Sequence, residues 1–218
     1  MRCELLKKAL PWLRREQESK SHSKLFLQGA KVVLRDKLLE DSVNDYAWRT
    51  DPELSKLDAT RPIKMSYSAF MKYSRGELDY PNSSSKRLAV DTIEGIHIGN
   101  CMYYDIDPRR RQAELGIMIG DRRYQGMGYG TDAVLVLLCH IFEATPIGRV
   151  YLHTLEWNAR ARSSFAKAGF LETKNVRREG MDFVKMDIHK CDWQNSRTIE
   201  AHRSKDDKNS AKVCLGPS

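Results

Sequence analysis

An apolar run beyond the middle of the chain restricts the fold more than any other segment. A helix is expected over residues 131–142, and apolar side chains lie on almost every side of it: Ala133, Val134, Leu135, Val136, Leu137, Leu138, Ile141 and Phe142. A helix that is hydrophobic all round is stable only when it is buried. Because the neighbouring runs at 112–119 and 150–155 are strand-like, we expect this helix to pack against a β-sheet.

Strand and helix patterns surround this helix on both sides. Strands are predicted at 31–35, 87–92, 96–105, 112–119, 150–155, 170–176 and 183–189, and further helices at 41–49, 66–78 and 158–168. Glu94-Gly95 and Asp107-Pro108 separate three consecutive strands, which favours an antiparallel arrangement. A strand–helix–strand–helix unit and a closing hairpin follow. This order predicts an α+β domain built on one sheet.

The charge of the chain is concentrated at its two ends. Residues 1–24 hold seven Lys/Arg against three Glu (+4), and residues 195–218 hold five against three (+2), so the total of +8 leaves +2 for residues 25–194. We expect a basic extension over 1–24 containing a short helix, a folded domain over 25–194 and a disordered polar tail over 195–218. So modest a charge on the domain is no signature of nucleic-acid binding.

Several classes of protein are not indicated. The five cysteines have irregular spacing without a CxxC pair, and no HExxH is present, so neither a disulfide framework nor a metal site is predicted. No stretch approaches the ~20 apolar residues that span a bilayer. Lys7, Lys8 and Pro11 interrupt the apolar N-terminal run where a secretory signal would lie. We therefore expect a cytoplasmic protein without a membrane partner.

A glycine-rich turn leads into the apolar helix. Gly126, Gly128 and Gly130 alternate within the run QGMGYGT, and glycine allows positive φ and a close approach to a ligand. The first amides of a helix have no intrahelical acceptor and carry positive potential, which suits a pyrophosphate. Arg122 and Arg123 precede the turn and could contact phosphates. The alternative is a turn that needs glycine for its shape only.

The spacing of these glycines excludes two well-known phosphate-binding motifs. The dinucleotide motif requires G-x-G-x-x-G after an early strand, whereas this turn has G-x-G-x-G late in the chain. The P-loop requires a lysine after its last glycine, where this chain has Thr131-Asp132.

Three segments in order carry a resemblance to a known family. Gln125, Gly128 and Gly130 fit a Gln/Arg-x-x-Gly-x-Gly/Ala loop; the segment AELGIMIG at 113–120 precedes it, and NARA at 158–161 with KAGF at 167–170 follows. These segments resemble the pyrophosphate loop, the fourth strand and the Asn-x-x-Ala … Lys-x-Gly-Phe segment of the GNAT acetyltransferases. The resemblance covers roughly residues 29–193, and the most similar branch contains the spermidine and ribosomal-protein alanine acetyltransferases.

The resemblance implies a fold, a co-substrate and a set of binding residues. The GNAT fold has a mixed central sheet of about six or seven strands, flanked by about four helices and splayed between its fourth and fifth strands by a bulge in the fourth. Acetyl-CoA, the co-substrate, would lie in that gap. Asn158 would face its arm, or only cap the following helix. The backbone of the fourth strand would contact pantetheine and the turn would hold the pyrophosphate: Ile117, Met118, Ile119, Arg123, Gln125, Gly126, Met127, Gly128, Tyr129, Gly130 and Thr131.

The implied reaction is acetyl transfer to an amine. A free alkylamine has a pKa near ~10.4, so a base must remove a proton before attack. Glu114 at the start of the fourth strand is the candidate base, or else only a salt-bridge partner, and a backbone amide near Met118 or Ile119 would stabilise the oxyanion. Many members place a tyrosine acid where this chain has Phe165. Tyr151 is a weaker substitute, and a thiol with a pKa near ~8.5 can leave unaided.

The acceptor stays open at this point. A primary amine is implied, either a small polyamine-like or aminoglycoside-like molecule or a protein N-terminus. Segments 50–86 and 177–182 should determine specificity. Five carboxylates in the first segment could recruit a cationic amine or be ordinary surface charge: Asp51, Glu53, Asp58, Glu77 and Asp79.

Two other functions remain as alternatives, and so does assembly. One is a non-catalytic CoA-binding or interaction module on the same fold. The other is a nucleic-acid or ribosome-associated protein that uses its basic ends. A homodimer is also left open.

Overall fold

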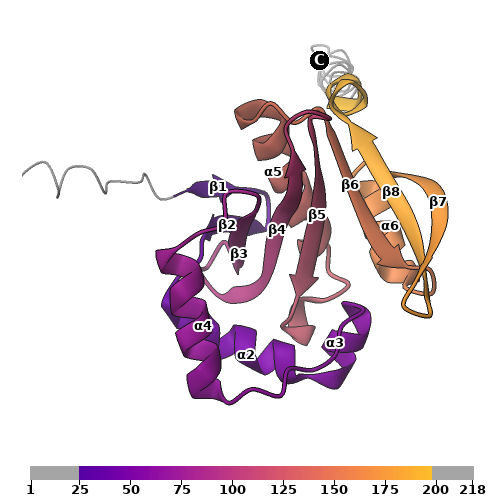
Figure 1. The fold of residues 1–218 in the computed structure, drawn as a ribbon. Helices are drawn as coiled ribbons and strands as arrows, with labels where there is room; N and C mark the ends of the chain where they lie inside the picture. The colour runs from indigo at the N-terminus through magenta and orange to yellow at the C-terminus, as the bar shows by residue number, and fades with distance from the viewer. Residues whose placement is uncertain (1–24, 198–218) are drawn as a thin grey trace, which may run out of the picture.

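The computed structural model describes residues 25–197, and an eight-stranded sheet organises them (Figure 1). The extension 1–24 with its expected helix, and the tail from 198 onward, lie outside the described residues. The strands follow the order β1-β2-β3-β4-β5-β6-β8-β7, and only β5 and β6 pair in parallel. Their bounds are β1 Phe26–Gln28, β2 Val32–Asp36, β3 Lys86–Thr92, β4 His97–Asp107, β5 Gln112–Ile119, β6 Arg149–Leu155, β7 Leu171–Arg178 and β8 Met181–His189.

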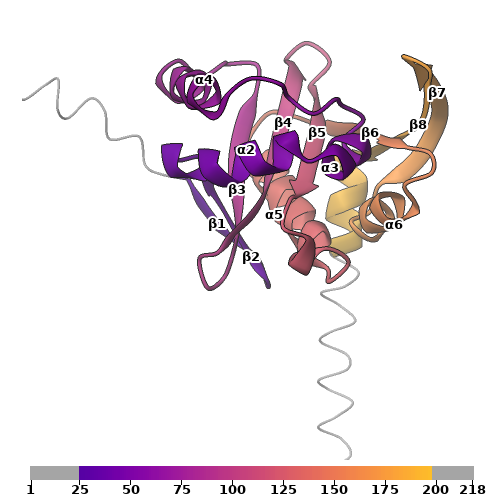
Figure 2. The same ribbon diagram turned by 90° about the horizontal axis from the view of Figure 1, so that it is seen from below.

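Five labelled α-helices surround this sheet in the described part of the chain. They are α2 Ser42–Thr50, α3 Pro52–Leu57, α4 Tyr67–Asp79, α5 Tyr129–Ala144 and α6 Ala159–Lys167. Figure 1 shows α2, α3 and α4 gathered at the end of the sheet where β5 finishes, and Figure 2 shows α5 and α6 on the face opposite α4. The predicted α+β class is confirmed. The strand number is eight rather than six or seven, because the short β1 precedes the first expected strand.

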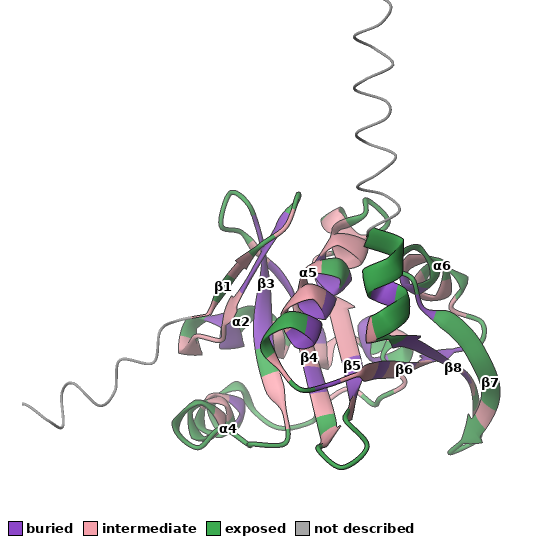
Figure 3. Cartoon of the chain, turned by 90° about the horizontal axis from the view of Figure 1, so that it is seen from above, coloured by how far each residue is buried: buried purple, intermediate pink, exposed green. Residues whose placement is uncertain are grey.

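The core lies between α5 and the strands beneath it, as the apolar run predicts. Figure 3 shows buried residues along α5 and along the central strands, whereas β7 at the sheet edge is exposed. The helix begins two residues earlier than expected, because Gly128 ends the turn in the left-handed region and acts as its N-cap. The buried side chains of α5 are Ala133, Val134, Leu137, Leu138, Ile141 and Phe142.

A helix missed by the sequence analysis follows β8. Residues 190–197 are helical, and Trp193 is buried with its ring centroid 5.4 Å from that of Phe142 on α5. Residues 195–197, which composition assigned to a polar tail, continue this helix, because the aromatic contact anchors it to the core.

In residues 25–197 no helix is long and apolar enough to cross a membrane.

The sheet divides into two halves beyond Glu114. Among the described residues, three pairs join β5 to β6, ending at Glu114↔Tyr151. Beyond them β5 continues beside β4 as far as Ile119, while β6 stays paired with β8 as far as Leu155. The predicted splay between the fourth and fifth expected strands is therefore present, between β5 and β6.

The bulge expected in the fourth strand lies in its neighbour instead. The β4–β5 register is unbroken from Glu114 to Ile119, and it shifts between Tyr104 and Asp107 of β4. Asp105 there adopts φ of +48°, a left-handed conformation that takes up the extra residue. β5 thus separates from β6 because β5 stays paired with β4 while β6 stays paired with β8.

Replacement of Gly120, directly after β5, is expected to have a large effect on stability. A Cβ at this position would lie 2.1 Å from Cδ2 of Trp48, which is buried on α2. We expect Gly120→Ala to lower the free energy of unfolding by about 2–3 kcal/mol, as overpacking of a core does. Urea unfolding would show a lower midpoint at an unchanged slope.

Gly76→Ala is the matched control for this substitution. Gly76 lies inside α4, and apart from the adjoining residues and the backbone of α4 no atom of the described residues comes within 4 Å of an added Cβ. Alanine should there raise stability by about 0.5–1 kcal/mol because it favours the helix. Equal stability of Gly120→Ala and the wild type would contradict the close packing of Trp48 on Gly120.

Candidate active site

A cleft of about 530 Å³ opens where β5 and β6 separate. One wall is β5 from residue 114 to 119, and the other combines the end of β6 at 153–155 with α6. The glycine turn closes one end, and α3 with the β7–β8 hairpin borders the other side. Every segment that the sequence analysis assigned to cofactor binding therefore contributes residues to one cavity.

The glycine turn has the backbone conformation that its composition predicts. Gly126 and Gly128 adopt φ of +75° and +87°, which side chains of L-residues rarely tolerate. The first intrahelical bond of α5 runs from Asp132 N to Gly128 O at 3.0 Å. The amides of Tyr129, Gly130 and Thr131 precede it, so they are free of intrahelical acceptors and available to an anion.

Contacts from distant parts of the chain hold this turn in place. Gln125 donates from Nε2 to the carbonyl of Ile119 at 2.7 Å, which ties the turn to the end of β5. Lys31 Nζ donates to the carbonyl of Met127 at 2.8 Å. Asp132 accepts from the amides of Lys31 and Val32 at 2.7 and 3.1 Å. The residues at the start of β2 therefore hold the turn in place.

Lys31 and Asp132 were missed by the sequence analysis. The helix dipole alone is enough to favour an aspartate in the first turn of a helix. The neighbouring residues of Asp132 therefore give no sign that it binds a distant segment. That partner lies about a hundred positions away in the chain.

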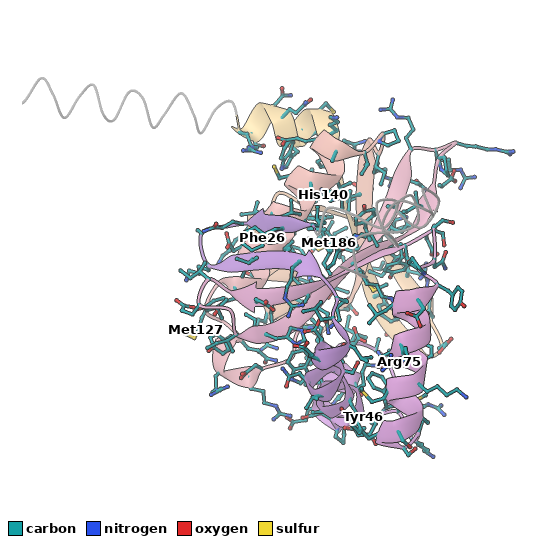
Figure 4. The ribbon with its side chains drawn as sticks, turned by 90° about the vertical axis from the view of Figure 1, so that its left-hand side faces the viewer. Phe26, Tyr46, Arg75, Met127, His140 and Met186 are labelled. Atoms are coloured by element: carbon teal, nitrogen blue, oxygen red, sulfur yellow. The ribbon has the colours of Figure 1, made fainter. Side chains whose placement is uncertain are left out.

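Three predicted binding residues lie outside the residues that line the cleft. Arg123 is exposed and pairs with Asp121 at 2.7 Å, because Asp121 also caps the short 3-10 helix that contains it. Met127 projects from the surface with 57 % of its area exposed (Figure 4). Tyr129 packs edge-on against Tyr124, with 5.1 Å between the ring centroids. The side chains of these last two residues thus lie outside the cleft lining, while their backbone remains part of the turn.

The opposite wall places Asn158 and Phe165 in the cleft lining. The side chain of Asn158 caps α6 by accepting from the amide of Ala161 at 3.2 Å. The capping role is thus present, and the residue still faces the cavity. Phe165 is buried and packs edge-on against Phe170 at 6.0 Å between centroids. This position is a core contact and has no proton to donate.

Glu114 lies where the two strands part, within a cluster of polar side chains. It is 8 % exposed, and its Oε1 is 2.8 Å from Nδ1 of His153 on β6. The Nε2 of His153 is 3.2 Å from Nη2 of Arg178 at the end of β7. Glu114 also faces Tyr104 of β4 and Tyr151 of β6 in the strand register. Four strands therefore supply this cluster.

The tyrosines beside Glu114 are weaker acids than a free phenol. Burial raises the pKa of Tyr104, and the negative charge of Glu114 raises it further. The pKa of Tyr151 is raised by the same two causes. Lys185 Nζ lies 4.1 Å from the centroid of the Tyr151 ring. Each phenol therefore gives up its proton less readily than a free phenol does, so Tyr151 is a poor substitute for the missing acid.

His153 was missed by the sequence analysis, as were Tyr104 and Arg178 of the same cluster. Val150, Leu152 and Thr154 of β6 are buried, so alternation already places Tyr151 and His153 on the other face. The contact with Glu114 depends on the pairing of β5 with β6, which no local pattern reveals.

Most of the carboxylates suggested for recruiting a cationic amine form ion pairs with arginines. Asp51 and Glu53 both pair with Arg122, at 2.7 and 2.6 Å. Glu77 pairs with Arg87 at 2.5 Å. Of the five, Asp58 lies in the cleft lining, and it is 3.3 Å from a guanidinium nitrogen of Arg49.

Comparisons with known proteins agree with this geometry. The family described as acetyltransferase (GNAT) domain matches residues 31–171. The spermidine N-acetyltransferase of Vibrio cholerae, solved with CoA and spermine, has a TM-score of 0.67 at 18% identity, covering 75% of this chain and 98% of that one. An aminoglycoside acetyltransferase in complex with coenzyme A has a TM-score of 0.64 at 19% identity, covering 76% of this chain and 99% of that one. At these identities the structural likeness concerns the fold.

Proposed function

Because this chain belongs to the acetyltransferase (GNAT) domain family and is an acetyl-CoA-dependent N-acetyltransferase, we propose that it acetylates a primary amine by direct attack in a ternary complex. The observation that carries this proposal is the position of Glu114. This buried carboxylate lies at the point where β5 and β6 separate, inside the cleft that the glycine turn closes.

The proposed cofactor position follows from the backbone groups that the fold leaves available. Beyond Glu114 the edge of β5 that faced β6 has lost its partner, so the backbone at 117–119 can pair with the amides of pantetheine as an added strand. The amides of Tyr129, Gly130 and Thr131 would receive the pyrophosphate. Asn158 would face the cofactor arm from the opposite wall. The thioester would then lie towards Glu114.

The proposed reaction needs one base and no protein acid. Glu114 takes a proton from the amine, whose nitrogen forms a bond to the acetyl carbon while the carbon–sulfur bond breaks. A backbone amide near Met118 or Ile119 stabilises the oxyanion. The departing thiolate takes its proton from solvent, which is feasible for a thiol with a pKa near ~8.5. The absence of a hydroxyl group at position 165 is therefore compatible with turnover.

The acceptor class that we propose is a polyamine-like or aminoglycoside-like amine, or a protein N-terminus. It would enter between α3 and the β7–β8 hairpin, past Asp58 and Arg178. Structures that share this fold carry spermine in one case and belong to an aminoglycoside-modifying enzyme in another, which supports small amines.

Release of free thiol from acetyl-CoA over a panel of amines tests the proposal. We expect at least one member of a set of spermidine, spermine, an aminoglycoside and N-terminal peptides to accelerate thiol release well above hydrolysis. The same amine with every primary amino group acetylated is the control and should be inactive.

Calorimetric titration with acetyl-CoA and with CoA completes this test. Binding without turnover on any amine would favour a non-catalytic CoA-binding module. Phe165, which has no proton to donate, is compatible with that alternative. No binding at hundreds of micromolar would remove the assignment of the cleft to coenzyme A.

A further inference from the structure

Glu114 is held by a two-step hydrogen-bonded chain that crosses three strands. We infer that His153 is a positioning residue for Glu114, and that Arg178 selects the histidine tautomer in which His153 can donate to it. The inference rests on the proposed function for the role of Glu114 as a base. The geometry of the chain itself does not depend on that role.

The contact with Arg178 determines which ring nitrogen of His153 carries the proton. A guanidinium has N–H donors and no acceptor, so Nε2 of His153, 3.2 Å from Arg178 Nη2, must offer its lone pair. The proton of the neutral ring then lies on Nδ1. From there it is donated to Oε1 of Glu114 over 2.8 Å. The same contact opposes a doubly protonated ring, because a second N–H would point at the guanidinium.

This arrangement favours the state of Glu114 that a base requires. A hydrogen bond from a neutral N–H stabilises the carboxylate over the carboxylic acid and fixes its orientation. It occupies one of about four lone-pair positions, and Tyr104 and Tyr151 also hydrogen-bond to this carboxylate, so about one position remains for an incoming amine. Without the donor, the buried carboxylate would lose one of the contacts that offset its burial and fix its orientation.

The groups around the pair come from every strand that packs against it. Tyr104 and Asp105 face it from β4, Tyr151 from β6 and Lys185 from β8. Burial and nearby cations lower the pKa of Lys185. Of these groups and Arg178, only Arg178 makes a hydrogen bond with the second nitrogen of His153. Arg178 is therefore the group that can select the tautomer.

The first test measures the tautomer directly in the ligand-free protein. Nitrogen-15 NMR of the histidine rings distinguishes a ring protonated on Nδ1 from one protonated on Nε2, and loss of the signal in His153→Asn assigns it. We expect the Nδ1–H form at neutral pH. In Arg178→Ala we expect a mixture of tautomers or a protonated ring. An Nε2–H ring in the wild type would overturn the inference.

The second test uses two polar replacements of similar size. The amide nitrogen of asparagine can occupy the place of Nδ1, whereas that of glutamine reaches the place of Nε2. We expect His153→Asn to keep kcat/KM within about threefold. We expect His153→Gln to lose about 10- to 100-fold, the usual effect of removing a hydrogen bond to a charged group.

The two variants should also separate in their pH profiles. In His153→Gln the acid limb of kcat/KM should move to higher pH, with KM for acetyl-CoA unchanged. Equal loss in both variants, or an unmoved acid limb in His153→Gln, would overturn the positioning role. If the wild type shows no turnover on any amine, the proposed function fails, while the NMR measurement still decides the tautomer.

Discussion

Replacing Gly128 by valine should reduce the affinity for acetyl-CoA by at least about 100-fold. Gly128 adopts φ of +87° and supplies the N-cap of α5. A β-branched residue is strained there, so the turn must change its path and the amides of residues 129–131 lose their common direction. Strain of about 1–3 kcal/mol together with lost hydrogen bonds to phosphate accounts for a loss of this size. Calorimetric titration measures it.

Gly95→Val provides a matched control for backbone strain. Gly95 adopts φ of +84° in the turn between β3 and β4, and apart from the two adjoining residues no atom of the described residues lies within 4 Å of an added Cβ. Both variants should lose similar thermal stability, but Gly95→Val should bind acetyl-CoA as the wild type does. Unchanged affinity in Gly128→Val, or equal losses in both variants, would contradict the placement of the pyrophosphate.

Glu114→Gln should lower kcat by about 100- to 10,000-fold while binding of acetyl-CoA stays unchanged. Glutamine keeps the shape of the side chain, and its carbonyl can still accept from His153, so the cluster is preserved. The amide cannot accept a proton, and general-base catalysis contributes about this much to rate. Steady-state kinetics over a range of pH, with calorimetry for the cofactor, measure both effects.

Asp58→Asn is the control for the loss of a negative charge at the cleft. Asp58 also lies in the lining, but on the α3 side and paired with Arg49. Its replacement should change kcat by less than about threefold. A pH–rate profile in Glu114→Gln that keeps the acid limb of the wild type would remove Glu114 from the role of base.

Local patterns predicted the elements that surround the site well. The strand expected at 112–119 has these bounds in the structure as β5, because a turn signal precedes it and the glycine-rich segment follows. The buried helix was also predicted correctly, since its apolar side chains leave no other stable location. The short α3 and β1 were missed, because six and three residues are too few to establish a period.

The position of the site was predictable, but its internal contacts were not. The glycine turn indicated an anion site because left-handed glycines and free helix amides are properties of neighbouring residues. Arg123 was assigned to phosphate from its charge and its position before the turn; in this structure it pairs with Asp121, and the assignment stays a prediction. The bulge expected in β5 lies in β4, because strand register depends on both partners of a pair.

The amino-acid sequence by itself determined the apolar helix, the turn before it and the strand that leads into it, because each depends on residues only a few positions apart. The tertiary structure alone decided that Glu114 meets His153, 39 positions later, and that Asp132 braces amides about a hundred positions earlier. Such contacts depend on which strands pair and in which register. Long-range packing selects that pairing, and no short stretch of the chain contains it.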